Sequence, residues 1–260
     1  MEWSVLGATV GAIAVLMLSM WALSLRLRDA SIVDIVWGFG FVVVAWVARA
    51  TAHGVSVRQN LLVALTTVWG LRLAGYLYWR NHGKGEDYRY RSMRKHYGDR
   101  WTIVSLYLVF GMQGVLMFTV SLPVQLGQMP DHPTGLGILA YLGLALWAIG
   151  LTFETVGDLQ LAKFKADPAN KGLVMDRGLW RFTRHPNYFG DFCVWWGLFL
   201  VAAETPLGII GVVGPIAMSI LLLRVSGVAM LERTIGRRRP GYAEYVARTS
   251  AFFPRPPRRT

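Results

Sequence analysis

Four polar side chains stand where two membrane-length apolar runs meet the polar segment between them. Glu154 and Asp158 fall in the last turns of the first run. Asn187 and Asp191 fall in the first turns of the next run. Ionisable groups are costly inside a membrane and are therefore candidates for function, with side chains that snorkel from an ordinary loop as the alternative. Grouped carboxylates and amides can hydrogen-bond a ligand's hydroxyl and amide groups, whereas a metal is not expected because no histidine follows either acid at helical spacing.

A fifth polar group, Asp34, lies inside the second apolar run, with Trp37 one turn further along. A carboxylate in that position costs roughly 2.5–3.5 kcal/mol on insertion scales, so it should face a polar cavity or a partner. The alternative is a helix-start group, because Asp34 follows Ser31 by three residues.

The third and fourth apolar runs add further candidates. Trp69, Arg72 and Tyr76 are spaced by four residues or fewer and share one face of a helix. Asn81 opens a basic, glycine-containing turn whose backbone could approach a phosphate, although arginines beside tyrosines are also typical of interfacial anchoring. Gln113 is a lone polar residue in the fourth run, and an interhelical hydrogen bond is its alternative role.

Composition indicates the class of protein that holds these residues. The chain has 260 residues, of which 54% are hydrophobic, and its mean hydropathy is +0.39. These values are typical of a polytopic membrane protein. The net charge of +12 lies in loops between apolar runs, so we do not expect a nucleic acid partner. The single cysteine, Cys193, excludes an intramolecular disulfide and is expected to be a small apolar residue in a helix.

The runs predict an all-α integral membrane protein with one domain, 1–260, and seven spans. These lie near 3–25, 31–50, 60–79, 103–125, 135–156, 187–203 and 206–231, and a tail follows at 232–260. Lys and Arg are abundant after spans one, three, five and seven, whereas 128–134 and 204–205 contain none. The positive-inside rule therefore places the N-terminus outside and the tail in the cytoplasm, with Arg49 and Arg58 as departures. No cleavable signal peptide is evident, because the first run is too long.

Four segments carry a resemblance to a known family. These are SIVDIVWG (31–38), GDLQLAKFKADPANKG (157–172), GLWRFTRHPNYFGD (178–191) and GYAEYVARTSAFFP (241–254). Together they resemble the bacterial branch of the steroid 5α-reductase family. Its superfamily also includes sterol reductases and isoprenylcysteine carboxyl methyltransferases. The resemblance implies seven membrane helices and NADPH as the cofactor. We expect a location in the bacterial inner membrane and contacts with membrane lipids, and no obligate protein partner is evident.

The resemblance also implies roles for individual residues. The implied cofactor-binding residues are Arg72, Asn81, Glu154, Asp158, Lys165, Arg184, His185, Asn187, Tyr188, Asp191 and Glu232. The implied substrate-binding residues are Asp34, Trp37, Trp69 and Gln113. Trp69 stands where the family has an acidic tyrosine, and Val33 stands where it has a glutamine. An indole cannot protonate an enolate, so the implied catalytic residues are Asp34 and Tyr76, unless the substrate differs.

The expected reaction is NADPH-dependent reduction of a carbon–carbon double bond conjugated to a carbonyl group. The substrate would be lipophilic, either steroid-like or isoprenoid, and would arrive from the bilayer. The first alternative is a methyltransferase of the same superfamily that uses S-adenosylmethionine, because the His-Pro-Asn-Tyr motif also resembles that branch. The second is a non-catalytic membrane scaffold or transporter. A transporter requires a polar path through the membrane, whereas these polar groups crowd to one side.

Overall fold

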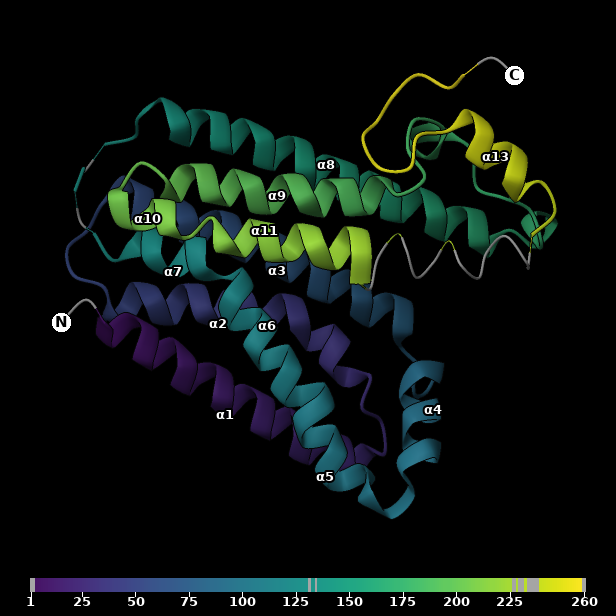
Figure 1. Ribbon diagram of the computed structural model, residues 1–260, viewed down its shortest axis with the longest axis horizontal. Helices are drawn as coiled ribbons and strands as arrows, with labels where there is room; N and C mark the ends of the chain where they lie inside the picture. The colour runs from purple at the N-terminus through teal and green to yellow at the C-terminus, as the bar shows by residue number, and fades with distance from the viewer. Residues whose placement is uncertain are drawn as a thin grey trace. The chain divides into compact units, whose positions relative to one another are not determined.

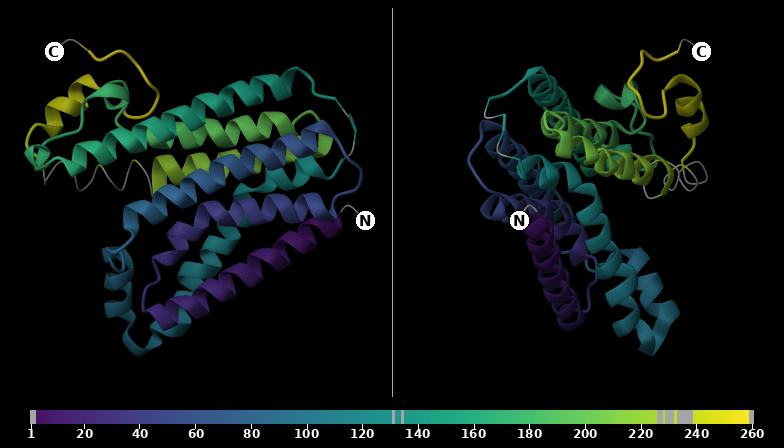
Figure 2. Two further views of the ribbon diagram at one scale, coloured as in Figure 1. Left: turned by 180° about the vertical axis from the view of Figure 1, so that it is seen from behind. Right: turned by 60° about the vertical axis from the view of Figure 1, so that its left-hand side comes forward.

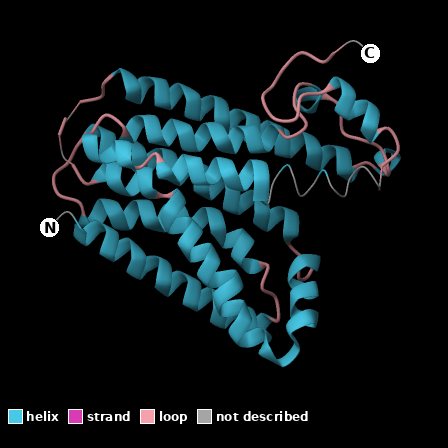
Figure 3. Cartoon of the chain, in the orientation of Figure 1, coloured by secondary structure: helices cyan, strands magenta, loops and turns pink. Residues whose placement is uncertain are grey.

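The computed structural model describes residues 3–130, 132–133, 135–225, 228, 232 and 239–258. Over these residues the regular elements are helices, without a strand (Figure 3). One isolated parallel bridge pairs Thr183 with Ser250. Six helical segments in this part of the chain are long and apolar enough to cross a membrane. The chain is therefore a helical, multi-pass membrane protein.

The helices follow one another as shown in Figure 1. The first half contains α1 (Trp3–Leu27), α2 (Ile32–Thr51), α3 (Val57–Asn81), α4 (Tyr88–Tyr97), a 3₁₀ turn (Gly98–Arg100), α5 (Trp101–Ser105), a π-helical segment (Leu106–Gly111), α6 (Met112–Val120) and α7 (Leu122–Gln128). The second half contains α8 (Ile138–Ala166), 3₁₀ turns (Pro168–Asn170 and Gly178–Arg181), α9 (Pro186–Ala202), α10 (Pro206–Ile210), α11 (Val213–Ile220), a π-helical segment (Leu221–Val225) and α13 (Tyr242–Arg248).

The predicted spans match these helices in most places. The span predicted at 103–125 is interrupted at Ser121, because Pro123 in the first turn of α7 starts a new helix. The span predicted at 135–156 continues to Ala166. The sixth span corresponds to α9, whose 17 residues are at the short limit for crossing a bilayer. Most of 226–238, including the end of the predicted seventh span, lies outside the described residues. Seven spans and their orientation therefore stay predictions.

The chain divides into two compact units, which are residues 1–141 with 198–214 and residues 142–197 with 215–260. In the first unit, α2 and α3 cross with their backbones almost in contact. A Cβ atom built on Gly38 would lie 2.5 Å from the Gly70 carbonyl oxygen, and one on Gly70 would lie 2.5 Å from the Gly38 oxygen. Small residues permit such an approach between membrane helices, so this crossing fixes the position of Asp34 relative to α3.

Arg58, one of the two departures from the charge pattern, is a structural residue of the first unit. Its side chain is fully buried at the start of α3. The guanidinium donates to the carbonyl oxygens of Pro130 at 2.6 Å, Pro133 at 3.0 Å and Gly127 at 3.3 Å. Carbonyl groups at and beyond a helix C-terminus need donors, and this arginine supplies them to the end of α7. The Arg58 charge is bound inside the fold and not displayed on a loop, which explains why this arginine departs from the pattern of basic loops.

In the second unit, α8 and α9 run side by side (Figures 1 and 2) along a seam of glycines. A Cβ atom on Gly150 would lie 2.6 Å from the Gly190 oxygen, and one on Gly197 would lie 2.7 Å from the Gly143 oxygen. The glycines recur at intervals of seven on each helix, which keeps them on one face over several turns. The seam positions the start of α9 against the later turns of α8.

Candidate functional site

The polar groups that flank the central segment gather at this seam. Glu154 and Asp158 lie one turn apart on α8 and are 3% and 5% exposed. Asn187, in the first turn of α9, donates from Nδ2 to Asp158 Oδ1 at 3.2 Å. Gly190 faces Glu154 so closely that a Cβ atom there would lie 2.4 Å from the Glu154 backbone nitrogen. The structure thus brings Glu154, Asp158 and Asn187 together, and half-buried Asp191 follows Asn187 by one helical turn.

Lys165 lies on the same helix as the acids, close to its C-terminal end. Its side chain is exposed, two turns after Asp158. Because α8 is continuous from Ile138 to Ala166, the acids and the lysine are held on one rigid element. The predicted fifth span ends at residue 156, which puts Lys165 in the following loop. This prediction is wrong, because Lys165 lies within α8.

Arg184, His185 and Glu232 form a second cluster, which joins the segment before α9 to later parts of the chain. Arg184 makes two bonds to Glu232, from Nε to Oε1 at 2.8 Å and from Nη2 to Oε2 at 3.2 Å. It also donates to the Thr249 carbonyl oxygen at 2.7 Å. His185 Nε2 lies 3.2 Å from Glu232 Oε1, and its ring stacks on Tyr188 at a centroid distance of 5.5 Å. These contacts join the segment before α9 to Glu232 and to the C-terminal segment, and the cofactor contacts that the resemblance implies for these residues stay predictions.

The charge state of Glu232 follows from these bonds. Burial by itself would raise the pKa of Glu232, but the hydrogen bonds from His185 and Arg184, together with the charge of Arg184, outweigh it and lower the pKa to about 2. The carboxylate is therefore ionised over the physiological pH range. A bidentate arginine–carboxylate pair of this kind is among the stronger polar contacts in proteins.

The C-terminal segment packs on the motif that precedes α9. Arg184 N donates to the Ser250 oxygen at 2.9 Å, and Thr183 Oγ1 donates to the Phe252 oxygen at 2.7 Å. Tyr245 donates its hydroxyl to the Trp180 oxygen at 2.5 Å, and burial raises its pKa above the usual value. The segments 178–191 and 241–254, which the sequence shows as separate motifs, are therefore parts of one local structure.

Asp34 lies in the first unit and has two strong partners on α4. Its Oδ2 accepts from Arg89 Nη2 at 2.7 Å, and its Oδ1 accepts from the Tyr90 hydroxyl at 2.7 Å. Tyr90 is 7% exposed, so its hydroxyl is largely withdrawn from solvent. The side chain of Ser31 makes no capping bond. Asp34 therefore lies in the first turn of α2, as the helix-start alternative predicts, and it is also bound to α4 through Arg89 and Tyr90.

The sequence analysis did not identify Arg89 and Tyr90 as site residues, because they lie in a stretch of alternating tyrosines and arginines. The signal that could have found them is the acidic pair Glu86 and Asp87 directly before α4. Asp87 caps that helix by accepting from Arg89 N at 2.9 Å and from Arg89 Nε at 3.0 Å. The acidic cap orients Arg89, which in turn reaches Asp34.

The remaining predicted residues are spread over the first unit. The ring of Phe41 contacts the ring of Trp37, at a centroid distance of 5.0 Å, and the ring of Trp69, at 5.6 Å. Trp69 is fully buried. Arg72 lies over the ring of Tyr76 at 5.6 Å. These contacts place Trp69 in the packing between α2 and α3.

Two further predictions concern Asn81 and Gln113. Asn81 accepts from Arg80 Nε at 3.1 Å at the end of α3. Gln113 lies half-buried on α6, and its side chain makes no hydrogen bond among the described residues. The interhelical hydrogen bond considered for Gln113 is therefore not formed within that part of the chain.

Comparison with known families identifies the family of this chain. Residues 20–249 match the model of the family described as "Protein of unknown function (DUF1295)". The chain belongs to this family. An uncharacterized protein of Schizosaccharomyces pombe is 20% identical over an alignment of 262 positions, which covers 91% of this chain and 76% of that protein. No solved structure matches.

Two further relatives match over shorter segments. The cobalt-zinc-cadmium resistance protein CzcN of Cupriavidus metallidurans is 31% identical over 112 residues, or 43% of this chain and 49% of CzcN. The probable O-methyltransferase ustE of Ustilaginoidea virens is 40% identical over 53 residues, or 20% of this chain and 18% of ustE.

Proposed function

We propose that this protein uses NADPH to reduce a carbon–carbon double bond conjugated to a carbonyl group in a lipophilic, steroid-like or isoprenoid molecule. The observation that carries the proposal is the cluster of Asp34, Arg89 and Tyr90, a proton donor and a cation held beside an apolar helix. The proposal includes α9 as a seventh span, with the N-terminus outside a bacterial inner membrane and the tail in the cytoplasm.

The polar cluster of the second unit suits a dinucleotide. Glu154, Asp158 and Asn187 offer carboxylate acceptors and an amide, which match the hydroxyl and carboxamide groups of NADPH. Lys165 supplies a cation on the same helix for a phosphate. The donor set therefore fits this cofactor.

The first unit provides the groups that would handle the proton. NADPH would be held by Glu154, Asp158, Asn187 and Lys165, and it would supply a hydride to the β-carbon of the substrate, so that negative charge would develop on the carbonyl oxygen. The Tyr90 hydroxyl, which donates to Asp34 Oδ1 in the structure, would turn from Asp34 to that oxygen and give it its proton, and the resulting enol would convert to the saturated carbonyl compound. Arg89 stabilises the negative charge that develops, and Asp34 orients both groups through its two oxygens. One proton is consumed in each turnover, and solvent restores it to Tyr90.

Tyr90 takes over a role for which Trp69 is unsuited. The resemblance assigns the acid to position 69, but Trp69 is fully buried against Phe41 and has no acidic proton to give. Tyr76, the other acid considered, lies between two arginines, with Arg72 at 5.6 Å and Arg80 at 5.7 Å from its ring. Tyr90 is the phenol that contacts Asp34 in the described chain.

The acid is tested by Tyr90→Phe in purified protein supplied with NADPH and a panel of lipophilic enones. General acids contribute typically about 10²–10⁴-fold, so turnover should fall by that factor while NADPH affinity, read from tryptophan fluorescence, stays unchanged. Asp34→Asn should give a similar loss. Tyr88→Phe is the matched control, because Tyr88 lies on the same helix and is 67% exposed. Wild-type turnover in Tyr90→Phe would refute the role of the phenol.

The cofactor site is tested separately by Asn187→Ala. Loss of the amide leaves Asp158 without this donor and removes a ligand contact, so NADPH binding should weaken by about 1 kcal/mol or more. Unchanged affinity in a well-folded variant would show that the contact is only structural.

A second candidate function is methyl transfer from S-adenosylmethionine, which the 53-residue similarity to a probable O-methyltransferase favours. Parallel fluorescence titrations with NADPH and with S-adenosylmethionine separate the two. Saturable quenching by S-adenosylmethionine alone would replace the reductase by the methyltransferase.

A further inference from the structure

An open pocket in the second unit is lined by arginines that the proposed reaction does not use. It has a volume of about 770 Å³ and is formed by two segments, 176–181 before α9 and 248–258 at the end of the described chain. Its charged lining residues are Asp176, Arg177, Arg181, Arg248 and Arg258. The pocket therefore holds four cations and one carboxylate.

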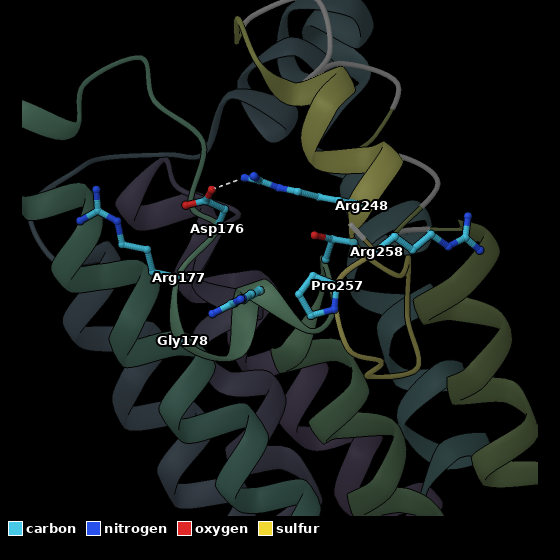
Figure 4. A pocket seen from close by; sticks show the side chains of 8 residues that line it. Asp176, Arg177, Gly178, Arg248, Pro257 and Arg258 are labelled. Carbon is cyan, nitrogen blue, oxygen red and sulfur yellow. Dashed lines mark hydrogen bonds and ion pairs between the residues drawn. The ribbon is translucent and has the colours of Figure 1, made fainter. Parts of the chain in front are cut away.

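The frame of the pocket is fixed by internal bonds. Arg248 forms an ion pair with Asp176 and so joins the two segments across the pocket (Figure 4). The backbone nitrogen of Arg258 donates to the Arg248 oxygen at 2.9 Å, which holds the terminal segment against the end of α13. Figure 4 shows Arg177 and Arg258 on opposite sides of the pocket.

The charge in this pocket is not balanced by the protein. The carboxylate of Asp176 is already paired with Arg248. Within the described residues, no carboxylate forms an ion pair with Arg177, Arg181 or Arg258. Like charges that share a cleft repel one another and raise the local concentration of anions. A neighbouring hollow of about 270 Å³ shares Arg248 and Arg258 and adds Arg255, which extends the positive region.

We propose that this arginine pocket binds a phosphate group. Guanidinium groups present planar pairs of donors that match phosphate oxygens, and four arginines along one hollow attract an anion. The phosphate can come from a membrane lipid headgroup or from a soluble nucleotide. The inference does not depend on reductase activity, because it rests on the charge and shape of the pocket alone.

The test uses purified full-length protein in a neutral detergent and two probes, short-chain phosphatidylglycerol and 2′,5′-ADP, each titrated by calorimetry. The double variant Arg181→Gln with Arg258→Gln should bind the preferred probe at least about ten-fold more weakly, since charge-assisted bonds are among the strongest. The control is Arg91→Gln, which removes an exposed charge elsewhere and should leave the affinity unchanged.

The opposite change gives an independent check. Asp176→Asn removes the carboxylate of the pocket, while the bonds from Arg184 N to the Ser250 oxygen and from Arg255 N to the Phe182 oxygen still join the two segments. Phosphate affinity should therefore stay unchanged or rise, whereas a pocket that depends on the Asp176–Arg248 ion pair would lose binding. Binding of phosphatidylglycerol only identifies a lipid site, and binding of 2′,5′-ADP only identifies a nucleotide site. If neither probe binds, or if the double variant binds as the wild type does, the inference is wrong.

Discussion

Gly190→Ala should destabilise the protein by pushing α8 and α9 apart. A Cβ atom at position 190 would lie 2.4 Å from the Glu154 nitrogen and 2.5 Å from the Gly150 oxygen. Both are backbone atoms, so no flexible side chain can move aside. Carbon atoms in optimal contact are about 3.5–4.0 Å apart, so the two helices must separate by roughly 1 Å.

The magnitude follows from the competing terms. Overpacking of a tight contact costs about 1–3 kcal/mol, and a backbone-on-backbone clash belongs at the upper end. Alanine gains roughly 0.5–1 kcal/mol over glycine within a helix, so the net loss should be about 2 kcal/mol. For a chain of this size that corresponds to a fall in Tm of roughly 4–8 °C. NADPH affinity should fall as well, because Glu154 and Asn187 lie on the two separated helices.

The assay is thermal unfolding in detergent, with Gly75→Ala as the matched control. Gly75 also lies inside a helix, but a Cβ atom there has nothing within 4 Å. The control should therefore keep the wild-type Tm or exceed it slightly. Equal Tm values for Gly190→Ala and Gly75→Ala would refute the close seam between α8 and α9.

Two further predictions concern pH and topology. The pKa of Glu232 is lowered to about 2 from an ordinary 4.5, so its stabilising bonds are complete above pH 4.5 and are lost as the pH falls toward 2. The Tm difference between wild type and Glu232→Gln should therefore shrink across that range, and a constant difference would contradict the ion pair with Arg184. In a cysteine-free background, Lys84→Cys and Lys171→Cys should be labelled from the cytoplasmic side and Gly135→Cys from the other. Labelling of 135 and 171 from one side would refute the seven-span arrangement.

The sequence alone determined the class of fold and much of the helix layout. Apolar runs of membrane length predicted helices, and the helix positions for the first three runs differ from the structure by only a few residues. Local signals can do this because hydrophobic length is set by bilayer thickness. The breaks at Ser121 and the extension of α8 to Ala166 were not visible, because a run of apolar residues does not show where a helix bends or how far it continues past the membrane.

For the candidate site, the sequence supplied residue types and the tertiary structure decided their partners. Glu154, Asp158 and Asn187 could be grouped in advance, because they flank one short polar segment and helical spacing places them near its ends. Asp34 could be recognised as an expensive group in an apolar run, but its partners Arg89 and Tyr90 lie 55 and 56 residues away. Long-range contacts of this kind depend on how α4 is turned against α2, which no local pattern encodes. The arginine pocket is the same case, since residues near 176 and near 248 become neighbours only when the C-terminal segment folds back on the motif before α9.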